Sequence, residues 1–241
     1  MRNRNVLTSN LLKEMYNIFD VDYTLIKKPS AWHFIREALA QKVISISSIR
    51  KLPFEWLRYK MGFPNKDFIE EAVKHLAGLE KNALKEVAET CFKQRMKADI
   101  YADAVQLIKN LQQRGEPVFI ATSSLDILIQ PLERFLGINE SIASTLEFSQ
   151  EKATGRIAGA GIFGENKKTA VGEWLTKHRI DPQNVCFYSD SYTDIPLLEY
   201  CGRAIAVNPD RFLHREAKKR GWQIMRFRKT LAQIPPGEQK G

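Results

Sequence analysis

Short apolar runs alternate with helix-length segments from residue 101 to residue 227, and this alternation limits the possible folds more than any other feature of the sequence. Apolar runs predict strands at 117–121, 185–189, 204–207 and 222–227. Residues 141–163 alternate as short strands around a turn. Helical periodicity predicts helices over 101–113, 126–136, 167–178, 194–200 and 210–220. Because strands that alternate with helices form parallel sheets covered on both faces, we expect an α/β fold.

One more buried strand is predicted at 16–20, far upstream of this α/β region. Between the two, long helical periodicity predicts helices over 30–41, 44–60, 66–77 and 80–97. We interpret this helical block as an insertion after the first strand. The predicted organisation is a discontinuous core (14–29 and 99–229), a helical cap domain (30–98) and a flexible tail (230–241).

The composition is that of a soluble globular protein, with 44% hydrophobic and 27% charged residues. No apolar run approaches the ~18 residues of a membrane-spanning helix, and the first residues lack the apolar region of a secretory signal. The chain has three cysteines without metal-ligand spacing, Cys91, Cys186 and Cys201. These features predict free thiols and a cytoplasmic location. A net charge of +9 favours anionic partners without choosing among metabolites, lipids and nucleic acid.

Two pairs of acidic residues follow predicted strands, at the sheet edge where α/β proteins bind ligands. Asp20 and Asp22 are two residues apart and can face the same crevice, and a divalent cation would compensate their repulsion. A solvated acidic turn is the alternative for this pair alone. Asp190 and Asp194 are four residues apart, which places them on one side of a first helical turn. Asp190 also suits a helix N-cap, so this second pair alone is more often structural. The two pairs at the same sheet edge together indicate a metal site more strongly than either pair alone.

Hydroxyl and lysine side chains stand at two further turns. Thr122, Ser123 and Ser124 follow the predicted strand 117–121, where hydroxyls and backbone N–H groups suit phosphate oxygens, although N-capping of the next helix explains them equally. Lys167 opens a predicted helix. It is either a solvated surface residue or the fixed cation of a phosphate site.

The order of these motifs resembles that of the haloacid dehalogenase superfamily: an Asp-x-Asp-x-Thr run at 20–24, a hydroxyl at 122, a lysine at 167 and an Asp-x-x-x-Asp run at 190–194. Further features resemble its phosphoserine-phosphatase-like subfamily IB. They are the runs at 164–167, 188–199 and 206–210 and the helical block after the first motif. The resemblance spans roughly residues 16–227. It implies a Rossmann-like parallel-sheet core with an inserted helical cap, and a Mg²⁺-dependent phosphomonoester hydrolase. Two positions depart from the family pattern, Tyr23 and Ser189, and neither removes a catalytic group.

The resemblance implies a role for each motif residue. Asp20 would attack phosphorus and form an aspartyl-phosphate, and Asp22 would protonate the leaving oxygen and then activate water. The Asp20 carboxylate, the Asp22 backbone carbonyl and Asp190 would hold Mg²⁺. Thr122 and nearby groups, including Ser123, would bind phosphoryl oxygens. Lys167 would neutralise charge, with Asp194 in support.

The insertion is expected to choose the substrate. Phosphoserine phosphatases have a glutamate shortly after the first motif that meets the substrate ammonium, whereas residues 25–33 hold Lys27 and Lys28 and no acid. We therefore expect a small organic or lipid-like phosphate, such as a lysophospholipid, rather than phosphoserine. Trp32 and His33 are candidate substrate-binding residues, although aromatic side chains there also suit the core of the cap.

Other functions remain open at this stage. Phosphotransfer to an alcohol through the same intermediate, or a non-catalytic binding module with this fold, are the alternatives to hydrolysis. The basic run from Arg211 to Lys229 suits ordinary surface charge, peripheral contact with an anionic membrane, or RNA. Surface charge is favoured, and no nucleic-acid partner is expected.

Overall fold

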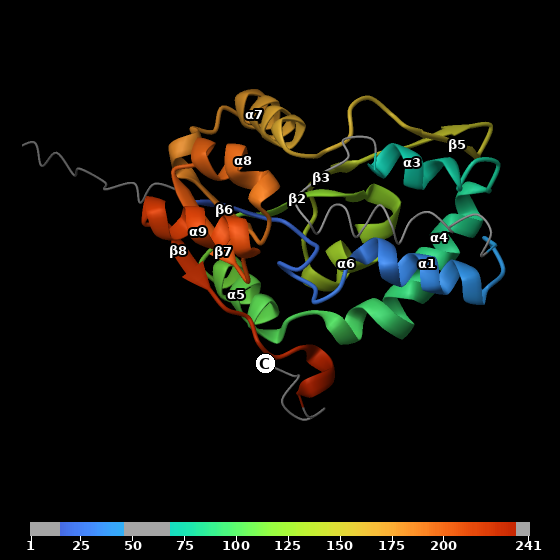
Figure 1. The fold of residues 1–241 in the computed structure, drawn as a ribbon, viewed down its shortest axis with the longest axis horizontal. Helices are drawn as coiled ribbons and strands as arrows, with labels where there is room; N and C mark the ends of the chain where they lie inside the picture. Colours follow the sequence, from blue (N-terminus) through green and yellow to red (C-terminus); the bar gives the residue numbers. More distant parts are fainter. Residues whose placement is uncertain (1–14, 46–67, 235–241) are drawn as a thin grey trace, which may run out of the picture.

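A six-stranded sheet organises the computed structural model, which describes residues 15–45 and 68–234 (Figure 1). The strand order is β3-β2-β1-β6-β7-β8, and every neighbouring pair is parallel. The strands are β1 (Tyr16–Phe19), β2 (Val118–Leu125), β3 (Ser141–Ser144), β6 (Val185–Ser189), β7 (Arg203–Val207) and β8 (Gln223–Met225). The predicted parallel α/β fold is confirmed.

Helices cover both faces of this sheet. They are α5 (Ala102–Gln113), α6 (Asp126–Leu136), α7 (Glu165–His178), α8 (Ile195–Tyr200) and α9 (Arg211–Arg220). Successive strand residues enter opposite cores: Phe187 packs with α7, α8 and α9, whereas Cys186 and Tyr188 pack with α5 and α6. Side chains alternate across a strand, so a sheet buried on both faces requires the continuous apolar runs seen in the sequence.

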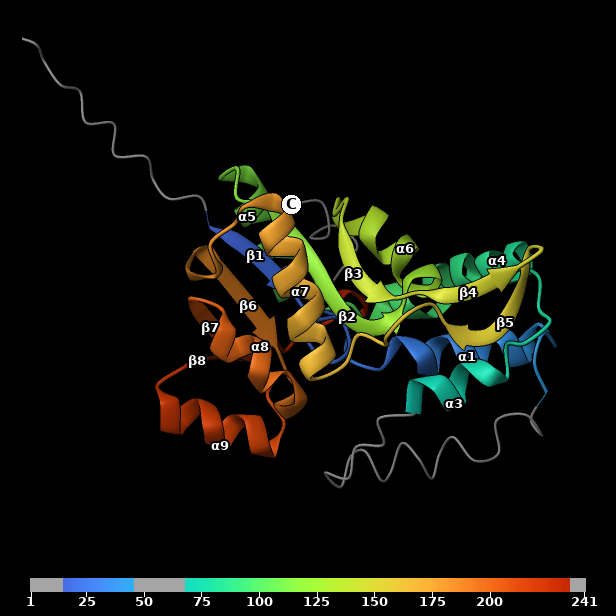
Figure 2. The same cartoon turned by 90° about the horizontal axis from the view of Figure 1, so that it is seen from above.

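The helical block between β1 and α5, hereafter the insertion (residues 30–98), lies to one side of the sheet (Figures 1 and 2). Its described helices are α1 (Ser30–Ala40), α3 (Phe68–Lys74) and α4 (Lys81–Cys91). A π-helical turn (Phe92–Met96) and a 3₁₀ turn (Lys97–Asp99) continue α4, so the predicted helix 80–97 is divided. Apolar side chains of α1 and α4 join the same buried cluster as α6. The predicted helix 44–60 falls almost entirely outside the described residues.

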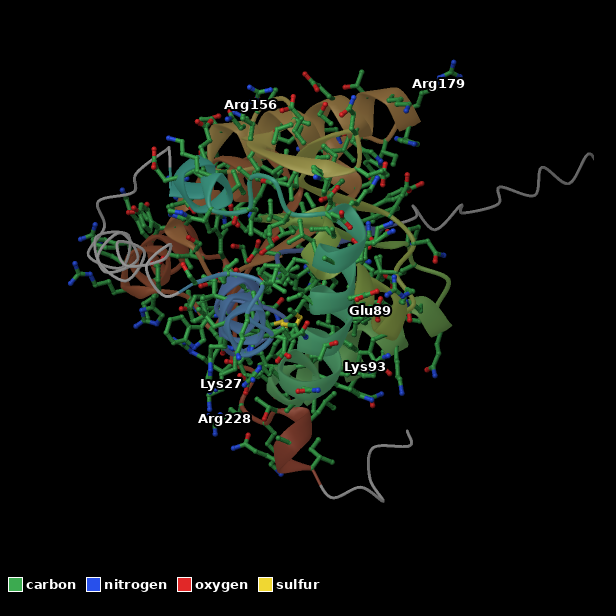
Figure 3. All side chains as sticks on the ribbon, turned by 90° about the vertical axis from the view of Figure 1, so that its right-hand side faces the viewer. Lys27, Glu89, Lys93, Arg156, Arg179 and Arg228 are labelled. Carbon is green, nitrogen blue, oxygen red and sulfur yellow. The ribbon has the colours of Figure 1, made fainter. Side chains whose placement is uncertain are left out.

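A β-hairpin that follows β3 in the chain packs against the insertion. Its strands, β4 (Leu146–Ser149) and β5 (Lys152–Ile157), are antiparallel and extend beside α3 and α4 (Figure 2). Backbone hydrogen bonds join the two segments, from Gly78 N to Ala153 O (2.8 Å) and from Ala153 N to Leu79 O (2.8 Å). At Gly155, with φ of 75°, a Cβ would lie 3.0 Å from Ala77 Cβ, so only glycine fits this close approach. On the outer side of the hairpin Arg156 projects into solvent (Figure 3).

Residues 230–234, which the sequence assigned to a flexible tail, pack against the link between insertion and core. Thr230 is 3% exposed and pairs with Tyr101, and a short turn η6 (Leu231–Gln233) follows. Residues 235–241 lie outside the described part. Among the described residues, no helix is both long enough and apolar enough to cross a membrane.

Candidate functional site

Three neighbouring strands bring the predicted site residues to one edge of the sheet. Asp20 directly follows β1, the central strand, and its backbone N–H donates to Tyr188 O of β6 (2.9 Å). Thr122 lies in β2 on the other side of β1, and Asp190 directly follows β6. Parallel strands end at a common edge, so segments more than a hundred residues apart in the chain meet there.

Lys167, in the first turn of α7, connects two of the carboxylates. Its Nζ donates to Asp20 Oδ1 (3.0 Å) and to Asp194 Oδ2 (2.7 Å), and all three side chains are buried. Burial lowers the pKa of Lys167, but Asp194 and Asp20 outweigh that effect and leave it raised. Lys167 is therefore a fixed cation inside the site. Lys168, the next residue in the chain, is 40% exposed and lies 3.6 Å from Glu165.

Ser189 completes this cluster from the end of β6. Its hydroxyl donates to Asp194 Oδ2 (2.7 Å) and accepts from Ser191 N (3.1 Å). The serine that departs from the family pattern thus holds the carboxylate that faces Lys167. This contact was not predicted, because the sequence shows a substitution at 189 but not its partner.

Asp20 and Asp190 form an anionic pair that suits a metal ion. Burial raises the pKa of Asp20 to about 7 against the lowering effect of Lys167, with Asp194 and Asp22 adding to the rise. Burial, followed by repulsion from Asp20 and Asp194, raises the pKa of Asp190 well above its usual value. No described residue donates a hydrogen bond to the Asp190 carboxylate. Two buried carboxylates with unfilled oxygens fit a hard divalent cation.

The described residues contain no group of three or more His, Cys, Asp or Glu side chains arranged to hold a metal. The predicted Mg²⁺ set does not require one, because it uses two carboxylates, from Asp20 and Asp190, and the backbone carbonyl of Asp22. Magnesium ordinarily keeps several waters and needs few protein ligands. The residues present therefore fit the ion, and its binding stays a prediction.

Asp22 is held from two sides. Its Oδ1 accepts from Ser30 N (2.8 Å), at the start of α1, and its Oδ2 accepts from Ser124 Oγ (3.3 Å), at the end of β2. Burial raises the pKa of Asp22, while the hydrogen bonds from Ser30 and Ser124 lower it. A raised pKa means that the carboxyl group keeps its proton to higher pH, which suits a proton donor. The contact with Ser30 was missed from the sequence, where a serine before a helical run indicates only a helix start.

Thr122 and Ser123 complete the β2 side of the site. Thr122 is 1% exposed and its Oγ1 accepts from Ser124 N (3.2 Å), whereas Ser123 is partly exposed. Strand β2 continues to Leu125, beyond the predicted end at 121, and its last residues present hydroxyl groups beside Asp22. Their contact with substrate stays a prediction.

Trp32 and His33, the predicted substrate-binding residues, have different surroundings on α1. Trp32 is 48% exposed. His33 is 4% exposed, and its Nε2 lies 3.2 Å from Asp99 Oδ2 without hydrogen-bond geometry. Lys28 also pairs with Asp99 (3.0 Å), so His33 and Lys28 belong to the link between insertion and core. Lys27, the chain neighbour of Lys28, is exposed (Figure 3).

Comparisons with known proteins agree with this geometry. The family model described as haloacid dehalogenase-like hydrolase matches residues 18–199. A histidinol-phosphatase of Neisseria meningitidis is 30% identical over 224 residues, which are 88% of this chain and 98% of the relative. A phosphoserine phosphatase of Mycobacterium tuberculosis is 27% identical over 215 residues, 87% of this chain and 70% of the relative.

Solved structures share the fold. A protein of unknown function from Bordetella pertussis superposes with a TM-score of 0.79 at 26% identity, covering 88% of this chain and 98% of that one. A phosphoserine phosphatase solved with a phospho-aspartyl intermediate analogue superposes with a TM-score of 0.67 at 20% identity, covering 91% and 96%. The predicted resemblance is confirmed.

Proposed function

This chain belongs to the haloacid dehalogenase-like hydrolase family, and on that premise we propose that it is a phosphatase that hydrolyses phosphomonoesters through an aspartyl-phosphate on Asp20. The observation that carries the proposal is the buried cluster of Lys167 between Asp20 and Asp194, with Asp190 beside it. Phosphoryl transfer depends mainly on positioning and charge stabilisation. The cluster supplies a fixed cation next to a carboxylate nucleophile.

The reaction divides into two displacements. In the first, a carboxylate oxygen of Asp20 bonds to phosphorus while the bond to the leaving oxygen breaks, and Asp22 gives that oxygen a proton. In the second, water attacks phosphorus, its proton passes to Asp22, and the Asp20 carboxylate is released with phosphate. Lys167 neutralises the charge of the phosphoryl group throughout.

Bound Mg²⁺ would add Lewis-acid stabilisation of the phosphoryl oxygens. The residues that would hold it are Asp20, Asp190 and the carbonyl of Asp22. Thr122 and Ser123 would bind the remaining phosphoryl oxygens from the β2 side. These roles agree with the burial of Thr122 and with the donor-free carboxylate of Asp190.

We propose as substrate a small phosphomonoester other than phosphoserine. The only acidic residue of α1, Glu37, is 3% exposed and bound to Arg95 (2.7 Å) and Gln41 (2.9 Å), so α1 presents no uncommitted carboxylate to an ammonium. A second candidate is histidinol phosphate, because the histidinol-phosphatase relative is 30% identical. Histidinol phosphate has the same ammonium beside the phosphate as phosphoserine, so this substrate requires a carboxylate outside α1. A lysophospholipid and a cytoplasmic location remain predictions.

The test measures release of phosphate and of alcohol from p-nitrophenyl phosphate in Mg²⁺, with and without glycerol as acceptor. We expect equal amounts of both products, and no turnover by Asp20→Asn when circular dichroism shows an intact fold. An excess of alcohol over phosphate in glycerol would indicate phosphotransfer. Full activity of Asp20→Asn would contradict the mechanism.

A further inference from the structure

Helix α1 begins without a side-chain cap of its own. Its N-cap residue is Pro29, and no side-chain hydrogen bond caps it. The first N–H groups of an α-helix have no partner within the helix, and the positive end of the helix dipole lies there. Ser30 N, the first of these groups, donates to Asp22 Oδ1 (2.8 Å). Asp22 thus serves as the missing cap of the first helix of the insertion.

The other carboxylate oxygen of Asp22 is bound by a pair of serine hydroxyl groups. Ser30 Oγ lies 2.6 Å from Ser124 Oγ, and Ser124 Oγ donates to Asp22 Oδ2 (3.3 Å). One of the two hydroxyls donates to the other, and the pair supplies the hydrogen that reaches Asp22. Ser30 is 0% exposed, which excludes bulk water as a competing partner.

The two serines come from different parts of the molecule. Ser30 belongs to the insertion, and Ser124 belongs to β2 of the central sheet. Ser124 N also donates to Thr122 Oγ1 (3.2 Å), so the β2 side is fixed independently of α1. One Asp22 oxygen therefore depends on where α1 lies, and the other on a hydroxyl that α1 in turn orients.

We propose that Ser30 and Ser124 are positioning residues for Asp22, so that the position of α1 relative to the end of β2 sets the orientation of the group that exchanges a proton with the leaving oxygen. This inference rests on the proposed function, in which Asp22 is that group. It makes the insertion part of the catalytic geometry, because the same serine that begins α1 holds the acid. Substrate-dependent movement of α1 would then change proton delivery directly.

The experiment compares a good and a poor leaving group, p-nitrophenyl phosphate and phenyl phosphate, in Ser30→Ala, Ser124→Ala and the double variant. A misdirected acid slows departure of the poor leaving group most. We expect kcat for phenyl phosphate to fall about 10- to 10²-fold, with a much smaller change for p-nitrophenyl phosphate. The double variant should lose little more than either single variant, because the two hydroxyls form one bridge.

Controls separate positioning from folding. Ser149→Ala, at an exposed serine of β4, should leave both substrates unchanged, and Ser124→Thr should restore part of the lost rate because it retains the hydroxyl. If circular dichroism shows that Ser30→Ala is unfolded, the leaving-group dependence of Ser124→Ala alone tests the inference. Equal losses on both substrates, or additive losses in the double variant, would overturn the inference. Asp22→Asn separates failure of the positioning inference from failure of the proposed function. If the activity lost in Asp22→Asn does not depend on the leaving group, the proposed role of Asp22 itself fails.

Discussion

Lys167 Nζ lies 3.0 Å from Asp20 Oδ1, although 147 positions separate the two residues in the chain. The contact forms because β1 ends beside β6 and α7 begins at the same edge. A second carboxylate, Asp194, shares the ammonium at 2.7 Å. Removing the cation would therefore leave two buried carboxylates without their partner.

We expect Lys167→Met to lower both activity and stability. Loss of one partner of a buried ion pair costs about 3–5 kcal/mol, because it leaves uncompensated charge. Urea unfolding at pH 7 measures the change in free energy of unfolding, and turnover of p-nitrophenyl phosphate should become undetectable. The matched control is Lys168→Met, whose side chain is 40% exposed and should change neither quantity measurably. An equal effect of both substitutions would mean that Lys167 is not the cation of the site.

Metal removal tests the paired carboxylates. We expect excess EDTA to abolish activity and Mg²⁺ to restore it. Titration calorimetry should show Mg²⁺ binding that Asp190→Asn weakens at least tenfold, because one of two carboxylate ligands is lost. Asp181→Asn is a suitable control, since Asp181 caps a short turn after α7 and lies outside the predicted metal set. Unchanged Mg²⁺ affinity in Asp190→Asn would exclude Asp190 from the metal set.

Asp22→Asn should impair leaving-group protonation more than phosphate binding. The amide keeps the shape of the side chain but has no transferable proton, so the rate for poor leaving groups should fall by the order of 10²–10⁴. The loss for p-nitrophenyl phosphate should be smaller, and KM should change little. Steady-state kinetics across aryl phosphates of graded acidity gives this dependence. A uniform loss across the series would contradict the acid assignment.

The sequence predicts the fold well where its signals are local. All five residues of β6 are buried, with Cys186 and Phe187 in opposite cores, as its mainly apolar run predicts, and α6 occupies the predicted range 126–136. The motif residues also meet as expected, because the carboxyl ends of parallel strands coincide. The family resemblance then connected these positions to one chemistry.

The contacts that the sequence did not predict are long-range. Ser30 and Asp99 carry no local sign of their partners: Ser30 marks a helix start, and Asp99 lies in a 3₁₀ turn after α4. Only the packing of α1 against α4, α6 and the turn after α4 brings Ser30 to Asp22 and His33 to Asp99. Predicting which side chains meet between the insertion and the core therefore requires the tertiary structure.

His33 gives a pH-dependent prediction. Burial lowers its pKa, with Asp99 opposing and Lys28 assisting the shift. A histidine with a depressed folded-state pKa contributes stability that is complete above about pH 6.5, its usual unfolded value, and is lost as pH falls through the folded pKa. We expect the free energy of unfolding to fall more steeply between pH 7 and pH 5 in the wild type than in His33→Gln. Urea titrations at several pH values measure this difference, and parallel curves would show that His33 does not titrate differently on folding.

The last prediction concerns substrate choice. Glu37, the only acid of α1, is bound to Arg95 and Gln41, and residues 25–33 contain no carboxylate, so an ammonium beside the phosphate finds no partner on α1. Binding sites discriminate strongly when a charged substrate group is left unpaired. We therefore expect kcat/KM for phosphoserine, and for histidinol phosphate, which has an ammonium on the same carbon, to lie well below that for amine-free phosphates of larger alcohols such as a lysophosphatidate. A preference for phosphoserine would show that a residue outside α1 and the 25–33 segment holds the ammonium.

Trp32 supplies the second half of this test. It is 48% exposed on α1, two residues from Ser30, which contacts Asp22. We predict that its exposed ring meets the leaving group of a larger alcohol. Trp32→Ala should reorder the substrate panel while leaving p-nitrophenyl phosphate turnover within about twofold, since an exposed side chain contributes little to folding. Phe135→Ala is the matched control, because Phe135 is an exposed aromatic (37%) on α6, outside the proposed site. If Trp32→Ala and Phe135→Ala leave the same substrate ranking, Trp32 does not bind substrate and the choice lies with other residues of the insertion.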